Sequence, residues 1–387
     1  MKPTVVVSGS VAQQPNRGGH TWAFFQYVLG FRRLGWDVVF LDRLEPEMCV
    51  SAGGHPSKIG DSANLRYFLD VMDRFGLADA FSLWCDRGRS VIGLSREEVL
   101  RRTGSSELLL NVMGFLTDDE VLGRARRRVF LDIDPGFGQM WHQLGLHDLF
   151  GAHDQVVTIG QRIGEPSCTI PECGRRWVTT PQPVVIEHWP VQPARPGPFT
   201  SVCSWRGPNG PVEYLGTTYG LRVHEFRKFA DLPRRTRARL EIALDIGEAD
   251  RRDIALLESN GWCLADPATV AADPWAYRAY IAASGAELMV AKNMYVTSRS
   301  GWFSDRSGCY LASGRPVVAQ DTGLEGLYPI GLGLVTFSTP EEALHAIEEV
   351  SADYLRHARA AREIAEECLD SDKVLTRLLD RLDVADH

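Results

Sequence analysis

No apolar run in the sequence reaches the roughly 18 residues that a membrane-spanning helix needs. The N-terminal residues pass directly into an apolar β-branched run and lack the apolar core of a signal peptide, so we expect a cytoplasmic protein. Positive charge is not in excess either, because 42 Lys and Arg stand against 50 Asp and Glu, which gives a net charge of −8. That balance argues against general binding to nucleic acid.

Cysteine pairs and sequence repeats are also nearly missing. Of eight cysteines only Cys168 and Cys173 lie close together, and a zinc site would need a second ligand pair. We interpret both as packing residues of a loop, because disulfides are rare in the cytosol. No repeat of 20 to 50 residues and no low-complexity tract is visible, so nothing suggests a repeat array, disorder or a fibre.

The length indicates more than one domain. A chain of 387 residues exceeds the size at which single hydrophobic cores stop growing, and its 44% hydrophobic content is ordinary for a globular protein. Residues 181–198 contain six prolines and few helix formers, which is typical of a stiff linker. We therefore expect domains at 1–190 and 191–345, followed by helices at 346–387 that are free to return to the first domain.

Both halves alternate apolar strands with amphipathic helices. In the first half strands are expected at 4–7, 36–41, 108–113, 129–133 and 155–159, and helices at 20–35, 63–75 and 95–104. In the second half strands are expected at 200–204, 240–246, 261–264, 287–291 and 317–319, and helices at 223–229, 250–259, 274–284, 307–312 and through most of 340–383. This pattern predicts an α/β protein with two doubly wound Rossmann-like domains facing a cleft.

Ligands of such sheets bind at the carboxyl ends of the strands, and the stretch 300–323 is the strongest candidate for a ligand site there. A loop of small and polar residues leads into a short helix whose first turn holds Ser304, Asp305, Arg306 and Ser307. Unpaired N–H groups and the helix dipole favour an anion at such a turn, and an arginine adds two parallel donors. The alternative is an ordinary capped helix, because serine and aspartate are common caps.

Two stretches make this architecture resemble the glycosyltransferases of the GT-B fold. Gly18-Gly19-His20 occupies the glycine-rich turn after the first strand, where many inverting members carry the histidine that deprotonates the acceptor. Residues 313–323, Ser-Gly-Arg-Pro-Val-Val-Ala-Gln-Asp-Thr-Gly, look like the family's nucleotide-sugar motif. The resemblance implies a nucleotide-diphosphate sugar donor in the second domain, with its diphosphate at the helix start, and a small-molecule or glycan acceptor in the first.

The resemblance also implies roles for individual residues. His20 would be the base, and we expect Asp134 to orient it, since an imidazole base often needs a carboxylate to fix its tautomer. The donor would be bound by Arg206, Lys292, Ser304, Asp305, Arg306, Ser307, Gln320, Asp321 and Thr322. We expect neither a metal nor a cofactor, because no Asp-x-Asp motif stands in a loop of the second domain.

The sequence departs from the family at two points. Gly301 and Cys309 stand where retaining members have two glutamates eight residues apart, and only Arg206 matches the usual Arg…Lys pair after the first strand of the second domain. These departures favour an inverting transferase over a retaining one. Two alternatives keep the fold: a sugar-nucleotide epimerase or hydrolase, and a non-catalytic protein that binds a nucleotide or phosphosugar.

Overall fold

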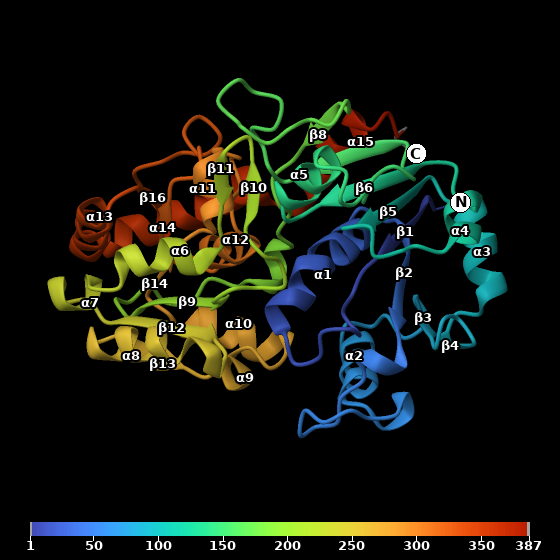
Figure 1. Ribbon diagram of the computed structural model, residues 1–387, viewed down its shortest axis with the longest axis horizontal. Coiled ribbons are helices and arrows are strands. Elements are labelled where there is room, and N and C mark those ends of the chain that lie inside the picture. Colours follow the sequence, from blue (N-terminus) through green and yellow to red (C-terminus); the bar gives the residue numbers. More distant parts are fainter. Residues whose placement is uncertain (1, 385–387) are drawn as a thin grey trace.

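The computed structural model describes residues 2–384 and shows two α/β halves, each built around its own sheet (Figure 1). The predicted α/β class with two Rossmann-like halves is confirmed. Within residues 2–384, no helix combines the length and apolar character that crossing a membrane would require.

The first half is an eight-stranded sheet in the order β4-β3-β2-β1-β5-β6-β7-β8, parallel except for the pair β3 and β4. Its central strands are apolar and buried on both faces, as expected for parallel strands that helices cover. The strands are β1 Thr4–Ser8, β2 Asp37–Leu44, β3 Phe81–Cys85, β4 Ser90–Gly93, β5 Leu108–Val112, β6 Arg128–Asp132, β7 Gln155–Thr158 and β8 Trp177–Thr179. The helices are α1 Gly18–Arg33, α2 Ala63–Arg74, α3 Arg96–Ser105, α4 Asp119–Arg124 and α5 Phe137–Gln143.

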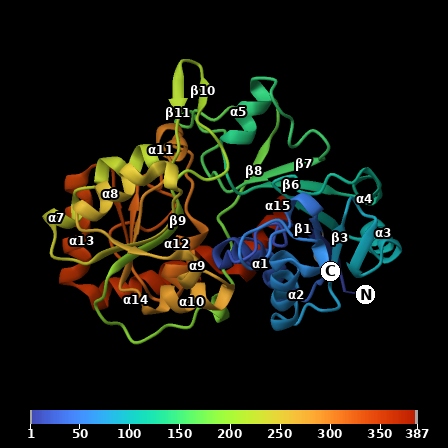
Figure 2. The same cartoon turned by 60° about the horizontal axis from the view of Figure 1, so that its bottom comes forward.

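The second half is a six-stranded parallel sheet in the order β13-β12-β9-β14-β15-β16. A hairpin, β10 Val212–Tyr214 with β11 Thr217–Tyr219, projects beside it and contacts α5 across the boundary (Figure 2). The strands are β9 Phe199–Ser204, β12 Leu240–Asp245, β13 Cys263–Ala265, β14 Ala286–Met289, β15 Val317–Gln320 and β16 Leu334–Phe337. The helices are α6 Arg222–Phe226, α7 Leu232–Arg235, α8 Arg251–Ser259, α9 Pro267–Val270, α10 Pro274–Ala283, α11 Asn293–Ser298, α12 Asp305–Ala312 and α13 Pro340–Ala352.

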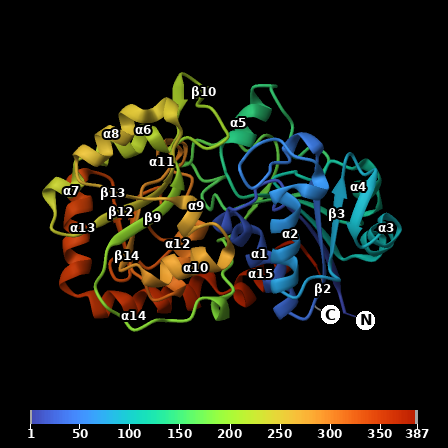
Figure 3. The ribbon, with the colours of Figure 1, turned by 90° about the horizontal axis from the view of Figure 1, so that it is seen from below.

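The C-terminal helices connect the halves a second time. Helix α14 (Tyr354–Ile364) lies on the second half, and after a π-helical turn α15 (Ser371–Arg381) packs against α1 of the first half (Figures 1 and 3). Arg33 on α1 pairs with Asp372 on α15 at 3.0 Å. A Cβ on Gly30 would lie 2.6 Å from the Leu375 side chain, so glycine permits this close approach.

The sequence did not predict several of the short helices and strands. The buried run 81–85 forms β3, the hairpin β10–β11 fills the loop predicted after residue 204, and α11 occupies residues predicted as part of a loop. Elements of three to six residues carry too little periodicity to stand out, and neighbouring backbone decides whether they pair. The longer elements, by contrast, begin and end within a few residues of their predicted limits.

Candidate functional site

The candidate site lies where residues that follow the strands of the two sheets meet, with α1 on one side and α10 and α12 on the other (Figures 2 and 3). The Gly18 N–H donates to the Ala271 carbonyl at 2.7 Å, and the Trp22 indole N–H donates to the Pro274 carbonyl at 2.9 Å. A Cβ on Gly18 would lie 2.1 Å from the Asp273 carbonyl oxygen, so this contact requires glycine. The glycine-rich turn of the first half is therefore a docking point for the second.

The loop that leads into α12 is anchored on the first half as well. The backbone N–H of Arg162 donates to the Ser300 carbonyl at 3.0 Å, and that of Thr169 donates to the Ser298 carbonyl at 3.1 Å. These bonds attach the loop that precedes α12 to the first half. Residues of both halves therefore hold the start of α12 in place.

The first turn of α12 has the polarity that its sequence predicts. Ser304 caps the helix by accepting a hydrogen bond from the Arg306 N–H at 3.3 Å. Burial raises the pKa of Asp305, and the neighbouring charge of Arg306 opposes that rise. The Ser307 hydroxyl is buried and has no hydrogen-bond partner within the described part of the chain. This turn retains donors that the protein itself does not use.

Arg306 is held inside the protein by a carboxylate, although its Nη2 has no hydrogen-bond partner within residues 2–384, and its role toward a diphosphate stays a prediction. Its side chain is buried, with Nε 2.5 Å from a Glu287 carboxylate oxygen and Nη1 donating to the Val202 carbonyl at 2.8 Å. Although burial alone would lower the pKa of Arg306, the Glu287 carboxylate raises it. Glu287 lies on β14 and is fully buried. Arg306 therefore joins α12 to the sheet through an internal ion pair.

Arg206 is also engaged by a carboxylate. Its guanidinium binds Asp250 with two parallel hydrogen bonds, of 2.8 Å from Nε and 2.5 Å from Nη2, and its side chain is 49% exposed. That hydrogen bond with Asp250 is the main cause of the raised pKa of Arg206. The pair joins the loop after β9 to the residue before α8, and the donor role predicted for Arg206 stays a prediction.

Lys292 and Asp134 meet across the boundary between the halves. The Lys292 ammonium lies 2.6 Å from the Asp134 carboxylate, and the Tyr295 hydroxyl donates to the other oxygen of that carboxylate. Asp134 follows β6 in the first half, whereas Lys292 caps α11 in the second. The predicted pairing of Asp134 with His20 is not formed, so Asp134 positions Lys292 instead.

Arg222 is a residue that the sequence did not single out. It opens α6, is 7% exposed, and donates through Nη1 to the Val290 carbonyl at the end of β14. Burial lowers the pKa of Arg222, and the neighbouring charge of Arg306 lowers it further. No salt bridge of Arg222 is formed within residues 2–384, and its Nε has no hydrogen-bond partner there. The hairpin β10–β11 separates Arg222 from β9 in the chain, so the sequence pattern after β9 did not indicate Arg222.

The loop predicted to touch the sugar uses its side chains internally. Gln320 accepts from the Ala291 N–H at 3.1 Å and donates to Glu225 at 2.7 Å. Asp321 accepts from the N–H groups of the next turn at 2.8 and 3.0 Å, and the Thr322 hydroxyl donates to the Trp302 carbonyl at 2.6 Å. These three residues shape the wall of the site, and only Asp321 among them is partly exposed.

His20 lies in the first turn of α1. Its Nε2 is 3.1 Å from the Ser10 hydroxyl and 3.2 Å from the Ser10 carbonyl oxygen, and its ring contacts Phe24 edge-on. Burial lowers the pKa of His20 to about 4, because the charged form is desolvated. The imidazole is therefore neutral at pH 7 and can accept a proton.

A cavity of about 280 Å³ opens at the ends of β1, β2, β3 and β5. His20 is not a wall residue, and it is connected to the cavity through Phe24, whose ring contacts His20 and packs against Phe115 of the wall. Asp42 forms part of the wall, and burial raises its pKa to about 7. The remaining wall residues are Gly9, Leu41, Arg43, Glu45, Trp84, Arg87, Gly88, Leu116, Thr117 and Asp118. This mixed apolar and polar cavity had no sequence signal.

Solved structures with the same arrangement are glycosyltransferases. HepE from Anabaena, in complex with UDP-glucose, matches over 99% of this chain and 100% of its own at 13% identity, with a TM-score of 0.59. Sucrose-phosphate synthase from Thermosynechococcus elongatus matches over 100% of both chains at 12% identity, with a TM-score of 0.54. The sequence matches no protein-family model and no curated protein. The chain therefore has the GT-B glycosyltransferase fold.

Proposed function

We propose that the protein transfers a sugar from a nucleotide-diphosphate sugar to a hydroxyl or amine of an acceptor. The observation that carries the proposal is the buried Arg222, which forms no ion pair within residues 2–384 and whose Nε has no hydrogen-bond partner there. Arg306 and Lys292 pair with Glu287 and Asp134, and Asp305 is the remaining carboxylate at the start of α12. A buried cation is unfavourable without an anion, and a diphosphate would supply one. The similar structures that hold UDP or UDP-glucose support this choice of ligand.

His20, Arg222 and Lys292 provide the chemistry of transfer. His20 takes the proton of the acceptor hydroxyl while that oxygen forms a bond to the anomeric carbon of the donor. The bond from this carbon to the diphosphate breaks, and the diphosphate leaves with the electron pair, which inverts the configuration at carbon. In the tautomer whose Nε2 donates to the Ser10 carbonyl, Nδ1 is the basic atom. Arg222 and Lys292 stabilise the leaving diphosphate, Lys292 after exchanging its bond with Asp134.

The test is a calorimetric titration with UDP, ADP, GDP and their glucose conjugates, followed by an assay of donor consumption with and without an acceptor panel. We expect one nucleotide series to bind and donor consumption to require an acceptor. Consumption without acceptor would contradict transfer and identify a hydrolase or epimerase. Binding without any consumption would identify a non-catalytic nucleotide-binding protein, and the absence of binding would overturn the donor site itself.

A further inference from the structure

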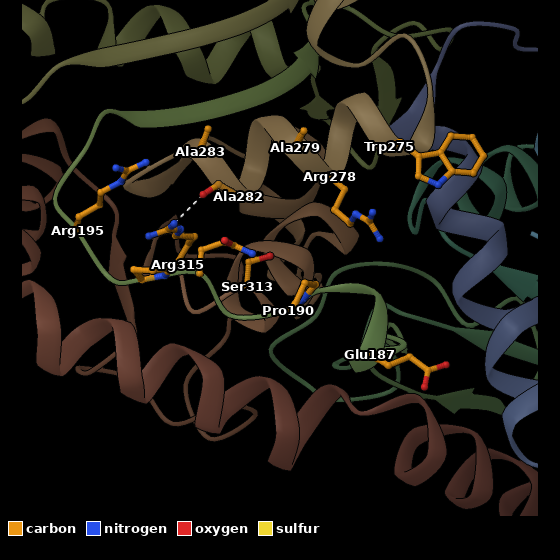
Figure 4. Close-up of a pocket in the computed structure, with 12 residues that line it drawn as sticks. Glu187, Pro190, Arg195, Trp275, Arg278, Ala279, Ala282, Ala283, Ser313 and Arg315 are labelled. Carbon is orange, nitrogen blue, oxygen red and sulfur yellow. Dashed lines mark hydrogen bonds between the residues drawn. The ribbon is translucent and has the colours of Figure 1, made fainter. Parts of the chain in front are cut away.

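A second cavity, of about 620 Å³, lies between the segment that connects the two sheets and helix α10 (Figure 4). None of its wall residues belongs to the strand ends that form the candidate site. The wall consists of Glu187, Pro190, Gln192, Pro193 and Arg195 from the connecting segment, Trp275, Arg278, Ala279, Ala282 and Ala283 from α10, and Ser313 and Arg315 after α12. This cavity is therefore separate from the proposed donor and acceptor sites.

Three arginines line this cavity without a carboxylate partner in residues 2–384. Arg278 donates only to a backbone carbonyl at 3.4 Å, and Arg195 forms no hydrogen bond or ion pair there. The only acidic side chain of the wall, Glu187, pairs with Arg33, which it shares with Asp372. Arg315, the third arginine, is buried.

Arg315 is 2% exposed and is held by neutral groups alone. Its Nη2 donates to the Ala282 carbonyl at 2.6 Å and its Nη1 to the Tyr354 hydroxyl at 3.1 Å. The C-terminal ends of α10 and α12 reach this region and together offset about one unit of positive charge. Arg195 is exposed and Arg278 is partly buried, so these two add positive charge to the cavity wall beyond what the helix ends offset. An anion in the cavity would pair with that charge.

The shape of the cavity limits the ligand further. Arg195 and Arg315 lie toward one end and Arg278 and Trp275 toward the other, with the small side chains of Ala279 and Ala282 between them (Figure 4). The Trp275 ring is already covered by Arg74, whose guanidinium carbon lies 3.3 Å from the ring centroid, so it closes that end. A volume of about 620 Å³ is in the range of sites for small organic ligands. We infer that the cavity binds an organic phosphate, with the phosphate group of the ligand beside Arg195 and Arg315 and the rest of the ligand along Ala279 and Ala282.

Isothermal titration with inorganic pyrophosphate and with glucose 6-phosphate tests this inference. The decisive variant is Ala279→Glu, because this exposed position faces the cavity and the new carboxylate supplies an internal counter-ion. Its matched control is Ala255→Glu, an equally exposed alanine on α8. We expect Ala279→Glu to lose one equivalent of bound phosphate compound, or to bind it about tenfold more weakly, which corresponds to about 1.4 kcal/mol. The control should bind as the wild type does.

Arg195→Ala is the second variant, and its side chain has no partner whose loss could unfold the protein. It should weaken the same equivalent while nucleotide binding at the α12 site stays unchanged, which separates this inference from the proposed function. If the wild type binds neither compound, or if Ala279→Glu keeps every equivalent at wild-type affinity, the inference is wrong.

Discussion

The two sides of the candidate site hold their polar groups in opposite ways. On the second half the charges are fixed in pairs, as in Arg306 with Glu287 on β14, and one cation, Arg222, is left over. On the first half His20 and Asp42 form no ion pair within residues 2–384, and burial lowers the pKa of His20 and raises that of Asp42, so that it favours the neutral form of each. The proposed transfer would use this difference, with one side binding a diphosphate and the other transferring a proton.

The largest expected effect is on the first half. His20→Ala should lower transfer by about 10²- to 10⁴-fold, because general bases contribute that much to such reactions. Donor affinity, measured by calorimetry, should be unchanged. The matched control is His345→Ala, an exposed histidine on α13. Wild-type turnover in His20→Ala would show that His20 is not the general base.

The next largest effect is on the stability of the second half. Arg306→Met leaves Glu287 buried without a partner, so we expect the free energy of unfolding to fall by about 3–5 kcal/mol. The double variant Arg306→Met, Glu287→Leu should recover most of that loss in a denaturant titration. If the single variant is as stable as the wild type but loses nucleotide affinity, Arg306 is a donor ligand as its position in the sequence suggested.

A smaller effect is expected where the two sides meet. Lys292→Met should weaken nucleotide binding about tenfold, which corresponds to about 1.4 kcal/mol, because a cation near the diphosphate is lost. Asp134→Asn should instead keep or raise the affinity, since it frees Lys292 from its ion pair. Equal losses in the two variants would show that the pair acts only in folding.

The smallest effect concerns pH. With His20 as base and a pKa of about 4, its basic form is fully present above that value and is lost as the pH falls through it. Transfer under saturating substrate should therefore change less than about twofold between pH 8 and pH 6. A fall of about tenfold over this range would point to Asp42, whose pKa is about 7, as the base instead.

The fold could be predicted from the sequence because long apolar strands and amphipathic helices alternate in it with clear periodicity. The start of α12 could be located for the same reason, since Ser304 and its neighbours follow a strand and precede a helix. The partners of the charged residues could not. Asp134 and Lys292 are 158 residues apart in the chain, and nothing in either stretch encodes their contact.

Arg222 shows the other limit of sequence reading. The charge of an arginine is visible in the sequence, whereas its burial is created by strands and helices that arrive from elsewhere. The hairpin β10–β11 moves it away from the end of β9, where a phosphate-binding arginine was sought. Arg206, which does stand at that place, is bound by Asp250.

The most direct test of the account is the affinity of Arg222→Met for UDP, measured by calorimetry beside Arg237→Met, which removes an exposed arginine in the segment between α7 and β12. Replacing a buried, uncompensated cation by an apolar side chain should leave the protein at least as stable. We predict that Arg222→Met binds UDP at least about tenfold more weakly than the wild type, a loss of about 1.4 kcal/mol or more, while Arg237→Met binds it equally well. Unchanged affinity in a folded Arg222→Met protein would contradict the central claim.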